Sequence, residues 1–283
     1  MPRDHTMPGD TLRLGLIGDN IRASRSPLLH RIAGEMLGIP TVYDSLIPAE
    51  LGRDFDAVFA DCAATRAGIN VTYPYKEVAV RKVTVDDPLV RGIGAVNTVL
   101  FEADGAKGHN TDFTGFKAAH ARVRGAAAPG TVLMIGTGGV GRAVAFGLAG
   151  LGATALRLVD RDRAKAETLA AELRAAAAAM TVEVAGDAEA AARGCDGLIN
   201  CTPLGMDGYP GTPLPRAAMA GAAWAFDAVY TPEDTQFLTD AAAEGLQIIS
   251  GWELYFYQGV HASRLFTGRS LDEDALRARL RED

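Results

Sequence analysis

Thr131-Val-Leu-Met-Ile-Gly136-Thr-Gly138-Gly-Val-Gly141 is the stretch that decides the fold of half of this chain. An apolar run of strand character leads into Gly-x-Gly-x-x-Gly, and apolar residues at helical spacing follow. A second apolar run ends at Asp160, about 20 residues past the last glycine. A lone glycine motif also marks ordinary turns, but here the flanking strand, helix, second strand and acidic residue all agree. The sequence therefore predicts a Rossmann-type domain that binds a dinucleotide.

Each part of this fingerprint has a physical role. Gly136 permits a tight turn, Gly138 lets the backbone approach a pyrophosphate, and Gly141 allows close packing of helix on strand. The N–H groups at the helix N-terminus favour phosphate binding. Asp160 is placed to accept hydrogen bonds from the ribose hydroxyls of the cofactor.

The composition bounds the class of protein. The 283 residues suffice for two domains, and 48% hydrophobic and 22% charged residues are typical of a soluble globular chain. The net charge of −7 gives no reason to expect nucleic acid or an anionic membrane as a partner. The sequence has no apolar stretch of transmembrane length, and we expect no signal peptide because the first residues lack an apolar core. Three scattered cysteines predict reduced thiols and a cytoplasmic location, and five histidines without ligand spacing predict no metal.

Alternating strand and helix patterns predict an α/β protein with mostly parallel sheets. We expect a substrate-binding and catalytic α/β domain over residues 1–113 and the dinucleotide domain over 114–250. C-terminal helices over 251–283 are expected to return to the first domain, the last of them starting at the capping box Ser270-Leu-Asp-Glu273. In the first domain we expect a strand over 95–101 and a turn over 105–108. A substrate is then expected beside the carboxyl ends of the strands, in the cleft between the domains.

Four further segments carry small polar and charged groups where strands and helices meet. Each has a structural explanation as well, such as a helix cap for Ser26 or Asp112 and a solvated surface position for Lys76. Lys76 stands out, because a cation in the first turn of a helix opposes the helix dipole. A lysine beside an aspartate would form an acid–base pair suited to moving a hydroxyl proton. The segments are Ser24-Arg25-Ser26-Pro27, Asn70-Val-Thr72-Tyr-Pro-Tyr-Lys76, Gly94-Ala-Val-Asn97-Thr98 and Gly108-His-Asn-Thr-Asp112.

In order and spacing, these segments resemble the motifs of the shikimate dehydrogenase family. Three later segments, at 200–206, 227–235 and 251–258, follow the pattern of the same family, so the resemblance covers residues 12–268. It implies reversible hydride transfer between a nicotinamide cofactor and shikimate, and also quinate as the second substrate. Lys76 and Asp112 would be the catalytic pair.

The resemblance also implies the binding residues. Ser24 and Ser26 would hold the substrate carboxylate, while Thr72, Lys76, Asn97, Asp112, Tyr230 and Gln258 would contact the ring hydroxyls. The residues expected around the cofactor are Gly136, Gly138, Gly139, Val140, Gly141, Asp160, Arg161, Thr202, Val229 and Gly251.

The cofactor expected is NAD, with NADP disfavoured. Members of the family that use NADP usually carry Asn-Arg-Thr after the second strand of the dinucleotide domain, whereas this chain has Asp160-Arg161-Asp162. The carboxylate of Asp160 would repel a 2′-phosphate. Ser26 favours shikimate over quinate, and Leu254 in place of the family's usual methionine leaves an amino-substituted analogue open.

The sequence leaves alternatives open for the assembly and for the function. The chain is expected to act as a monomer or homodimer, and the sequence does not choose between them. A quinate-selective or aminoshikimate-selective dehydrogenase fits the same motifs. A methylene-tetrahydrofolate dehydrogenase would also place a lysine near a dinucleotide domain, but Ser24-x-Ser26 does not suit a pterin. A non-catalytic NAD sensor is the remaining rival, disfavoured because Lys76 and Asp112 are both present.

Overall fold

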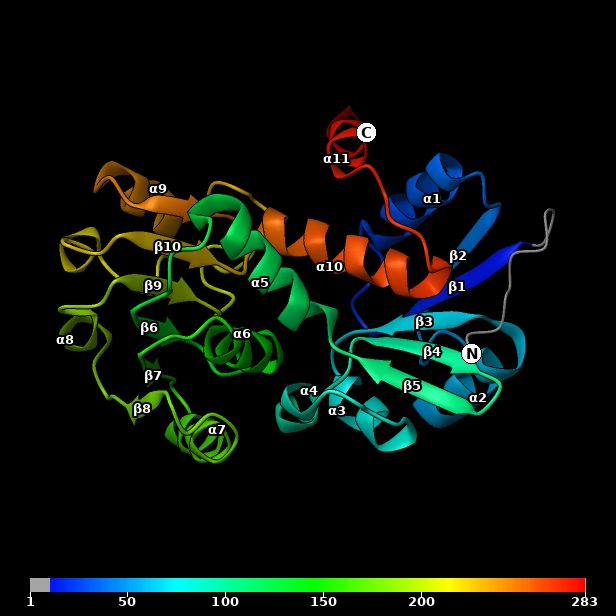
Figure 1. Cartoon of the computed structure of the whole chain (residues 1–283), viewed down its shortest axis with the longest axis horizontal. Coiled ribbons are helices and arrows are strands. Elements are labelled where there is room, and N and C mark those ends of the chain that lie inside the picture. The colour runs from blue at the N-terminus through cyan, green and yellow to red at the C-terminus, as the bar shows by residue number, and fades with distance from the viewer. Residues whose placement is uncertain (1–10, 283) are drawn as a thin grey trace. The chain divides into compact units, whose positions relative to one another are not determined.

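The computed structural model describes residues 11–282, and the chain divides into two compact units. The first unit comprises the chain up to Thr111 and the segment from Gln258 onward, and the second runs from Asp112 to Tyr257. Both boundaries fall inside helices, α5 (Thr111–Arg124) and α10 (Gly251–Thr267). Each unit is built on its own sheet (Figure 1).

The sheet of the first unit is mixed rather than mostly parallel. β1 pairs in parallel with β2 and β3, whereas β4 is antiparallel to both β3 and β5. β4 ends at Glu102 and β5 begins at Gly105, and so short a connection permits only an antiparallel pair. The turn expected over 105–108 is therefore wrong, because those residues are part of β5. The order is β2-β1-β3-β4-β5, with β1 at Leu12–Ile17, β2 at Thr41–Leu46, β3 at Gly68–Val71, β4 at Thr98–Glu102 and β5 at Gly105–His109.

Three helices of the first unit begin at an aspartate cap. Asp54 and Asp87 accept hydrogen bonds from the first turns of α2 and α4. The last helix, α11, is capped by Asp272, whose Oδ1 accepts from Ala275 N at 3.0 Å, so the capping box predicted at Ser270 is not the start. The helices are α1 (Ser26–Leu37), α2 (Phe55–Thr65), α3 (Lys76–Ala79), α4 (Pro88–Ile93) and α11 (Glu273–Glu282), with a 3-10 turn η1 at Val80–Lys82.

The C-terminal segment packs on α1. A β-carbon added at Gly259 in α10 would lie 2.4 Å from Leu29 Cδ1, so the glycine lets the two helices approach closely. Arg279 in α11 pairs with Glu35 at 2.5 Å, and Arg25 donates to the carbonyl oxygen of Leu280 at 2.7 Å. These contacts bind the end of the chain to the first unit.

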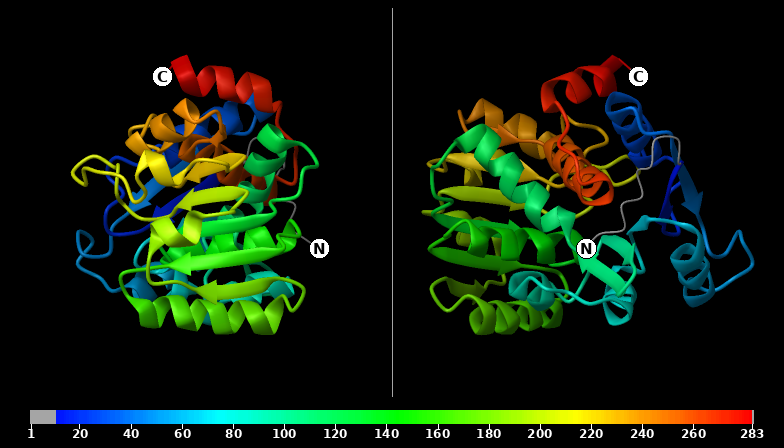
Figure 2. Two further views of the ribbon diagram at one scale, coloured as in Figure 1. Left: turned by 90° about the vertical axis from the view of Figure 1, so that its left-hand side faces the viewer. Right: turned by 45° about the vertical axis from the view of Figure 1, so that its right-hand side comes forward.

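The second unit holds six strands, and every neighbouring pair is parallel. The order β11-β10-β9-β6-β7-β8 is the Rossmann order, which reverses at β6 (Figures 1 and 2). The predicted α/β class with a Rossmann-type second domain is confirmed. The strands are β6 (Thr131–Ile135), β7 (Ala155–Val159), β8 (Thr181–Val184), β9 (Gly197–Asn200), β10 (Trp224–Asp227) and β11 (Gln247–Ile249).

Helices cover both faces of this sheet. On one face, Phe116 of α5 lies against Phe226 of β10 with ring centroids 5.1 Å apart, and a β-carbon on Gly147 of α6 would lie 2.7 Å from Phe116. On the other face, Leu133 and Leu198 share an apolar cluster with residues of α8 and α9. The remaining helices are α6 (Gly139–Gly150), α7 (Arg163–Ala176), α8 (Ala188–Ala192) and α9 (Gln236–Ala243), with a 3-10 turn η2 at Arg216–Ala218.

Candidate functional site

In the glycine loop after β6, two glycines are packed closely against neighbouring backbone and two others face open space. Gly136 has a φ of 96°, and a β-carbon there would lie 2.6 Å from the carbonyl group of Cys201. A β-carbon on Gly141 would lie 2.4 Å from the carbonyl oxygen of Gly136. Gly138 and Gly139 differ, because they are exposed and an added β-carbon would meet nothing within 4 Å. The start of α6 thus leaves room for a phosphate beside helix N–H groups, which fits a dinucleotide.

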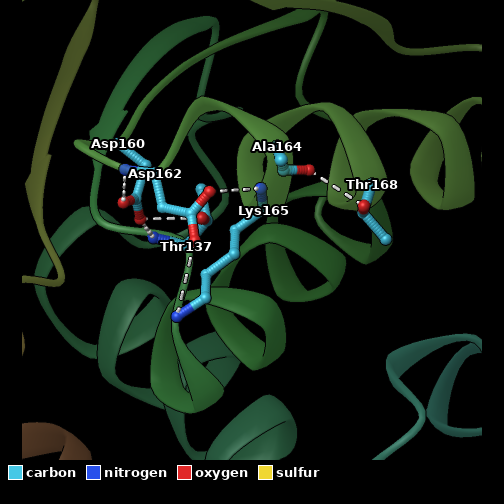
Figure 3. Close-up of polar contacts among 6 residues, drawn as sticks. All are labelled: Thr137, Asp160, Asp162, Ala164, Lys165 and Thr168. Carbon is cyan, nitrogen blue, oxygen red and sulfur yellow. Dashed lines mark hydrogen bonds and ion pairs between the residues drawn. The ribbon is translucent and has the colours of Figure 1, made fainter.

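Asp160, directly after β7, is held by the glycine loop (Figure 3). Its Oδ2 accepts from the backbone N of Thr137 at 2.7 Å and from Thr137 Oγ1 at 2.8 Å. Its Oδ1 accepts from the backbone N of Asp162 at 2.9 Å. Partial burial works to raise the pKa of Asp160, but hydrogen bonds from Asp162 and Thr137 outweigh it and hold that pKa below its usual value. The carboxylate is therefore ionised at neutral pH and fixed in place.

Basic side chains follow Asp160, and two of the three have carboxylate partners. Arg163 pairs with Glu167 at 2.9 Å, and Lys165 Nζ lies 4.0 Å from Asp162 Oδ2. Arg161 is exposed. The surroundings of Asp160 thus offer less positive charge to an anion than the sequence Asp-Arg-Asp-Arg-Ala-Lys suggests.

A buried polar network fixes the loops after β9 and β10. Asn200 Nδ2 donates to Asp227 Oδ1 at 3.0 Å, and Thr235 Oγ1 donates to Asp227 Oδ2 at 2.7 Å. Asn200 Oδ1 in turn accepts from Thr202 N and Oγ1 at 2.9 and 2.7 Å, while Asp227 Oδ1 accepts from Val229 N at 2.9 Å. Two residues predicted to contact the cofactor, Thr202 and Val229, are therefore positioned by this network.

Asp227 carries an unusual protonation equilibrium. Its side chain is fully buried, and burial raises its pKa to about 6 against the opposing hydrogen bonds from Thr235, Val229 and Asn200. Val229, two residues further on, lies against Gly251. Tyr230 is 37% exposed and stacks on Tyr255 with ring centroids 5.5 Å apart.

In the first unit, Asn97 joins β4 to the start of α5. Its Oδ1 accepts from Thr111 N at 2.7 Å, from Thr111 Oγ1 at 3.1 Å and from Thr98 Oγ1 at 3.1 Å. None of these bonds uses Asn97 Nδ2, so the amide nitrogen is the group that this buried residue can offer to a ligand. Asp112 follows Thr111 directly and lies in the first turn of α5, rather than at its cap.

Around Asn97 lies a second buried network, and apart from Asn97 its members were not among the predicted site residues. Asn70 Nδ2 donates to Thr98 Oγ1 at 2.9 Å and to the carbonyl oxygen of Asn97 at 3.2 Å, and Asn70 Oδ1 accepts from Tyr43 Oη at 2.9 Å. His30 stacks on Tyr43 at 4.8 Å. Burial lowers the pKa of His30 to about 3 despite its hydrogen bond with Asn70, so the ring is neutral. Asn70 is a polar residue within a fully buried strand, and that was the available signal.

The serine segment lies at the N-terminus of α1. Ser24 Oγ accepts from Ser26 N at 3.2 Å, and both serines are partly exposed. Arg25, not Ser26, is the cap residue of α1. Thr72 follows β3 and is partly exposed; a β-carbon on Gly18 would lie 2.4 Å from its Cγ2.

Lys76 begins α3, and its side chain is partly exposed. Because α3 has four residues, the helix-dipole argument that singled out Lys76 is weak. Asp112 is 7% exposed. Of the predicted substrate residues, Ser24, Ser26, Thr72, Lys76, Asn97 and Gln258 belong to the first unit, while Asp112, Tyr230 and all ten predicted cofactor residues belong to the second.

Two family models match the chain. Residues 16–99 match the shikimate dehydrogenase substrate-binding domain, and residues 132–245 match the saccharopine dehydrogenase NADP-binding domain. The first match contains the serine, lysine and asparagine segments, and the second contains the glycine loop and Asp160.

Whole-chain relatives agree with these models. The quinate/shikimate dehydrogenase (NAD(+)) of Corynebacterium efficiens is 37% identical over 96% of this chain and 98% of its own length. The chain belongs to the shikimate dehydrogenase family. The shikimate dehydrogenase (NADP(+)) of Pseudarthrobacter chlorophenolicus is 34% identical over 95% of this chain and 94% of its own. The solved quinate dehydrogenase of Corynebacterium glutamicum in complex with NAD superposes with a TM-score of 0.90, at 32% identity over 96% and 99% of the two chains.

The resemblance inferred from the motifs is thereby confirmed, and this family member is an NAD(P)-dependent oxidoreductase. Across residues 11–282, no helix combines the length and apolar character needed to cross a membrane. Over the same residues, no group of three or more His, Cys, Asp or Glu side chains could hold a metal ion.

Proposed function

We propose that this enzyme interconverts shikimate and its 3-dehydro acid, accepts quinate as a second substrate, and prefers NAD to NADP. The curated relatives include dehydrogenases named for both acids and for both cofactors, so family membership alone does not choose among them. The choice must come from residues of this chain.

The observation that carries the cofactor preference is the fixed, ionised carboxylate of Asp160. A 2′-phosphate beside it would meet a negative charge, whereas a ribose hydroxyl could donate to it. Compensation by nearby cations is weakened, because Arg163 and Lys165 already face Glu167 and Asp162. Gly138, Gly139 and Gly141 with Val140 would cradle the pyrophosphate, and Arg161 would lie near the adenosine ribose. Thr202, Val229 and Gly251 would hold the nicotinamide end.

The substrate residues are assigned by the same motifs. Ser24 and Ser26 at the start of α1 would hold the carboxylate, because hydroxyl and N–H donors at a helix N-terminus favour anions. Asn97 would donate from Nδ2 to a ring hydroxyl, since its Oδ1 is occupied by Thr111 and Thr98. Thr72, Asp112, Gln258 and Tyr230 would complete the contacts to the ring. Ser26, rather than threonine, favours shikimate as the preferred acid.

In the reaction, bound NAD would supply hydride acceptance and donation at the nicotinamide ring. Lys76 Nζ would take the proton of the reacting hydroxyl when the alcohol is oxidised, and return it in the reverse direction. Asp112 would orient that hydroxyl and hold the lysine. General acid–base catalysis of this kind contributes ~10²–10⁴ in rate.

Two alternative functions fit the same motifs less well. A quinate-selective or aminoshikimate-selective enzyme differs in pocket shape, on which Leu254 bears. A non-catalytic NAD sensor would keep the glycine loop without needing Lys76. We also propose a cytoplasmic location, which the three free cysteines support. The proposed assembly is a monomer or a homodimer.

The test is a kinetic panel of shikimate and quinate against NAD and NADP, following absorbance of the reduced cofactor. We expect kcat/KM to be highest with shikimate and NAD, with at least tenfold discrimination against NADP. A preference for NADP would overturn the cofactor assignment. Tight NAD binding without turnover of either acid would favour the sensor, and light scattering would give the assembly.

A further inference from the structure

Thr137 occupies the second position of the glycine loop, and the fingerprint assigns no role to its side chain. It is 4% exposed and lies between Gly136, which turns the chain, and Gly138, which begins the open space at α6. Its hydroxyl and its backbone N–H both donate to a single atom, Asp160 Oδ2 (Figure 3).

These bonds occupy most of the acceptor positions of the Asp160 carboxylate. A carboxylate offers about four lone-pair positions, two on each oxygen. Thr137 fills both positions on Oδ2, and Asp162 N fills one on Oδ1. Oδ1 therefore retains one position for an incoming hydroxyl donor, and the carboxylate cannot rotate to exchange its oxygens without breaking all three bonds.

The hydroxyl of Thr137 has a second consequence. Because it donates its proton to Asp160, it does not offer that proton to a phosphate. The same bonds favour the charged form of Asp160, whose pKa lies below its usual value. Thr137 thus fixes the orientation of a carboxylate that is ionised at neutral pH.

We propose that Thr137 is a positioning residue for cofactor specificity: its hydroxyl holds Asp160 so that one oxygen accepts from a ribose hydroxyl and the fixed charge disfavours a 2′-phosphate. This inference rests on the proposed preference for NAD. It deepens that proposal, because the discrimination depends on a residue outside the usual glycine and acidic positions.

The test compares Thr137→Val with Thr137→Ser. Valine keeps the shape and the backbone donor but lacks the hydroxyl, whereas serine keeps the hydroxyl. Dissociation constants for NADH and NADPH are measured by cofactor fluorescence in the absence of substrate, so the readout does not depend on turnover. Thr168→Val is a matched control, because the Thr168 hydroxyl donates to the carbonyl oxygen of Ala164 at 2.9 Å and makes no bond to Asp160.

We expect Thr137→Val to lower the ratio of the NADPH to the NADH dissociation constant by about three- to tenfold, as the loss of one hydrogen bond of typical net strength implies. Thr137→Ser and Thr168→Val should keep the wild-type ratio. In an Asp160→Asn background, Thr137→Val should have no further effect on that ratio.

An unchanged ratio in Thr137→Val, or an equal rise in both constants, would overturn the inference. Should valine at 137 prevent folding, Thr137→Ala takes its place: a ratio equal to the wild type excludes a role for the hydroxyl as described, and a ratio lowered by threefold or more supports it. The ratio of the NADPH to the NADH dissociation constant in the wild type tests the proposed NAD preference separately. Tighter binding of NADPH by the wild type would refute the NAD preference, whereas the shift between wild type and Thr137→Val tests the threonine.

Discussion

Gly251 and Val229 are in such close backbone contact that residue 251 has no room for a side chain. A β-carbon on Gly251 would lie 2.2 Å from the carbonyl oxygen of Val229. The contact is between two backbones, so no rotation of a side chain can relieve it. Gly251 is also the first residue of α10. The start of this helix and the loop after β10 are therefore held at one fixed separation, and both residues are proposed to contact the cofactor.

Gly251→Ala should accordingly destabilise the protein and weaken NAD binding. Overpacking of this kind costs about 1–3 kcal/mol, which corresponds to a Tm lower by roughly 5 °C. Calorimetry and NADH fluorescence measure the two effects. Gly186→Ala is the matched control, since the nearest atom to a β-carbon there is Arg163 NH1 at 4.0 Å, and it should behave as the wild type. Equal Tm values for the two variants would contradict the steric argument.

Lys76→Ala should lower kcat by ~10² or more while leaving the dissociation constant of NAD nearly unchanged. The reason is that the lysine is proposed to act on the hydroxyl proton and not on the cofactor. Lys82→Ala is the control, because Lys82 lies in the adjoining 3-10 turn and pairs with Asp56 at 2.9 Å. Near-normal turnover in Lys76→Ala would refute the catalytic role.

Asn97→Ala should reduce both stability and substrate binding. The change removes the acceptor of Thr111 N, a buried backbone donor at the start of α5, at a cost of about 1–3 kcal/mol. It also removes the amide nitrogen proposed to contact the ring. Urea denaturation gives the free energy of unfolding, and the KM for shikimate should rise while that for NAD does not. A KM for shikimate equal to the wild type would remove Asn97 from the binding site.

Asp227→Asn should change how stability depends on pH. Burial raises the folded-state pKa of Asp227 to about 6, from a usual value of 3.8, so the folded state holds an extra proton between these values. The contribution of Asp227 to stability is therefore complete below pH 3.8 and is lost as the pH rises through about 6, by about 3 kcal/mol. Asparagine does not titrate, so the variant should gain stability relative to wild type between pH 4.5 and 7.5. A difference in unfolding free energy that stays constant over this range would contradict the assignment.

His120→Leu should protect the second unit from acid. His120 is 1% exposed, neither ring nitrogen has a hydrogen-bond partner, and its ring meets Trp224 edge-on at 5.2 Å. Burial, and then the charge of Arg124, lowers the pKa of His120 to about 4. The stability contributed by the neutral ring is present above pH 6.5 and lost as the pH falls through about 4, by about 3 kcal/mol. The Tm advantage of leucine should therefore grow from pH 8 to pH 4.5, and an advantage independent of pH would argue against this origin.

The sequence predicted most where one local pattern fixes one element. The apolar runs before the glycine motif and before Asp160 are β6 and β7, and the helical pattern between them is α6, because residue spacing and the glycines define each element locally. It predicted less well where competing turn or cap residues adjoin. The strand expected over 95–101 begins at Thr98, since Asn97 is used to hold α5, and Asp272 rather than Ser270 caps α11.

The sequence by itself determined the family, the Rossmann-type domain and the acidic residue that points to NAD, because these depend on residue types at fixed spacing along the chain. Only the tertiary structure decided which atoms of those residues already form hydrogen bonds within the protein. Thr137 and Asp160 are far apart in sequence and meet because β6 and β7 are neighbours with parallel register, and Asn200 meets Asp227 because β9 and β10 end side by side. The glycine motif predicts that β6 and β7 are neighbours, but which donor meets which acceptor at the strand ends depends on the positions of the atoms in the folded sheet.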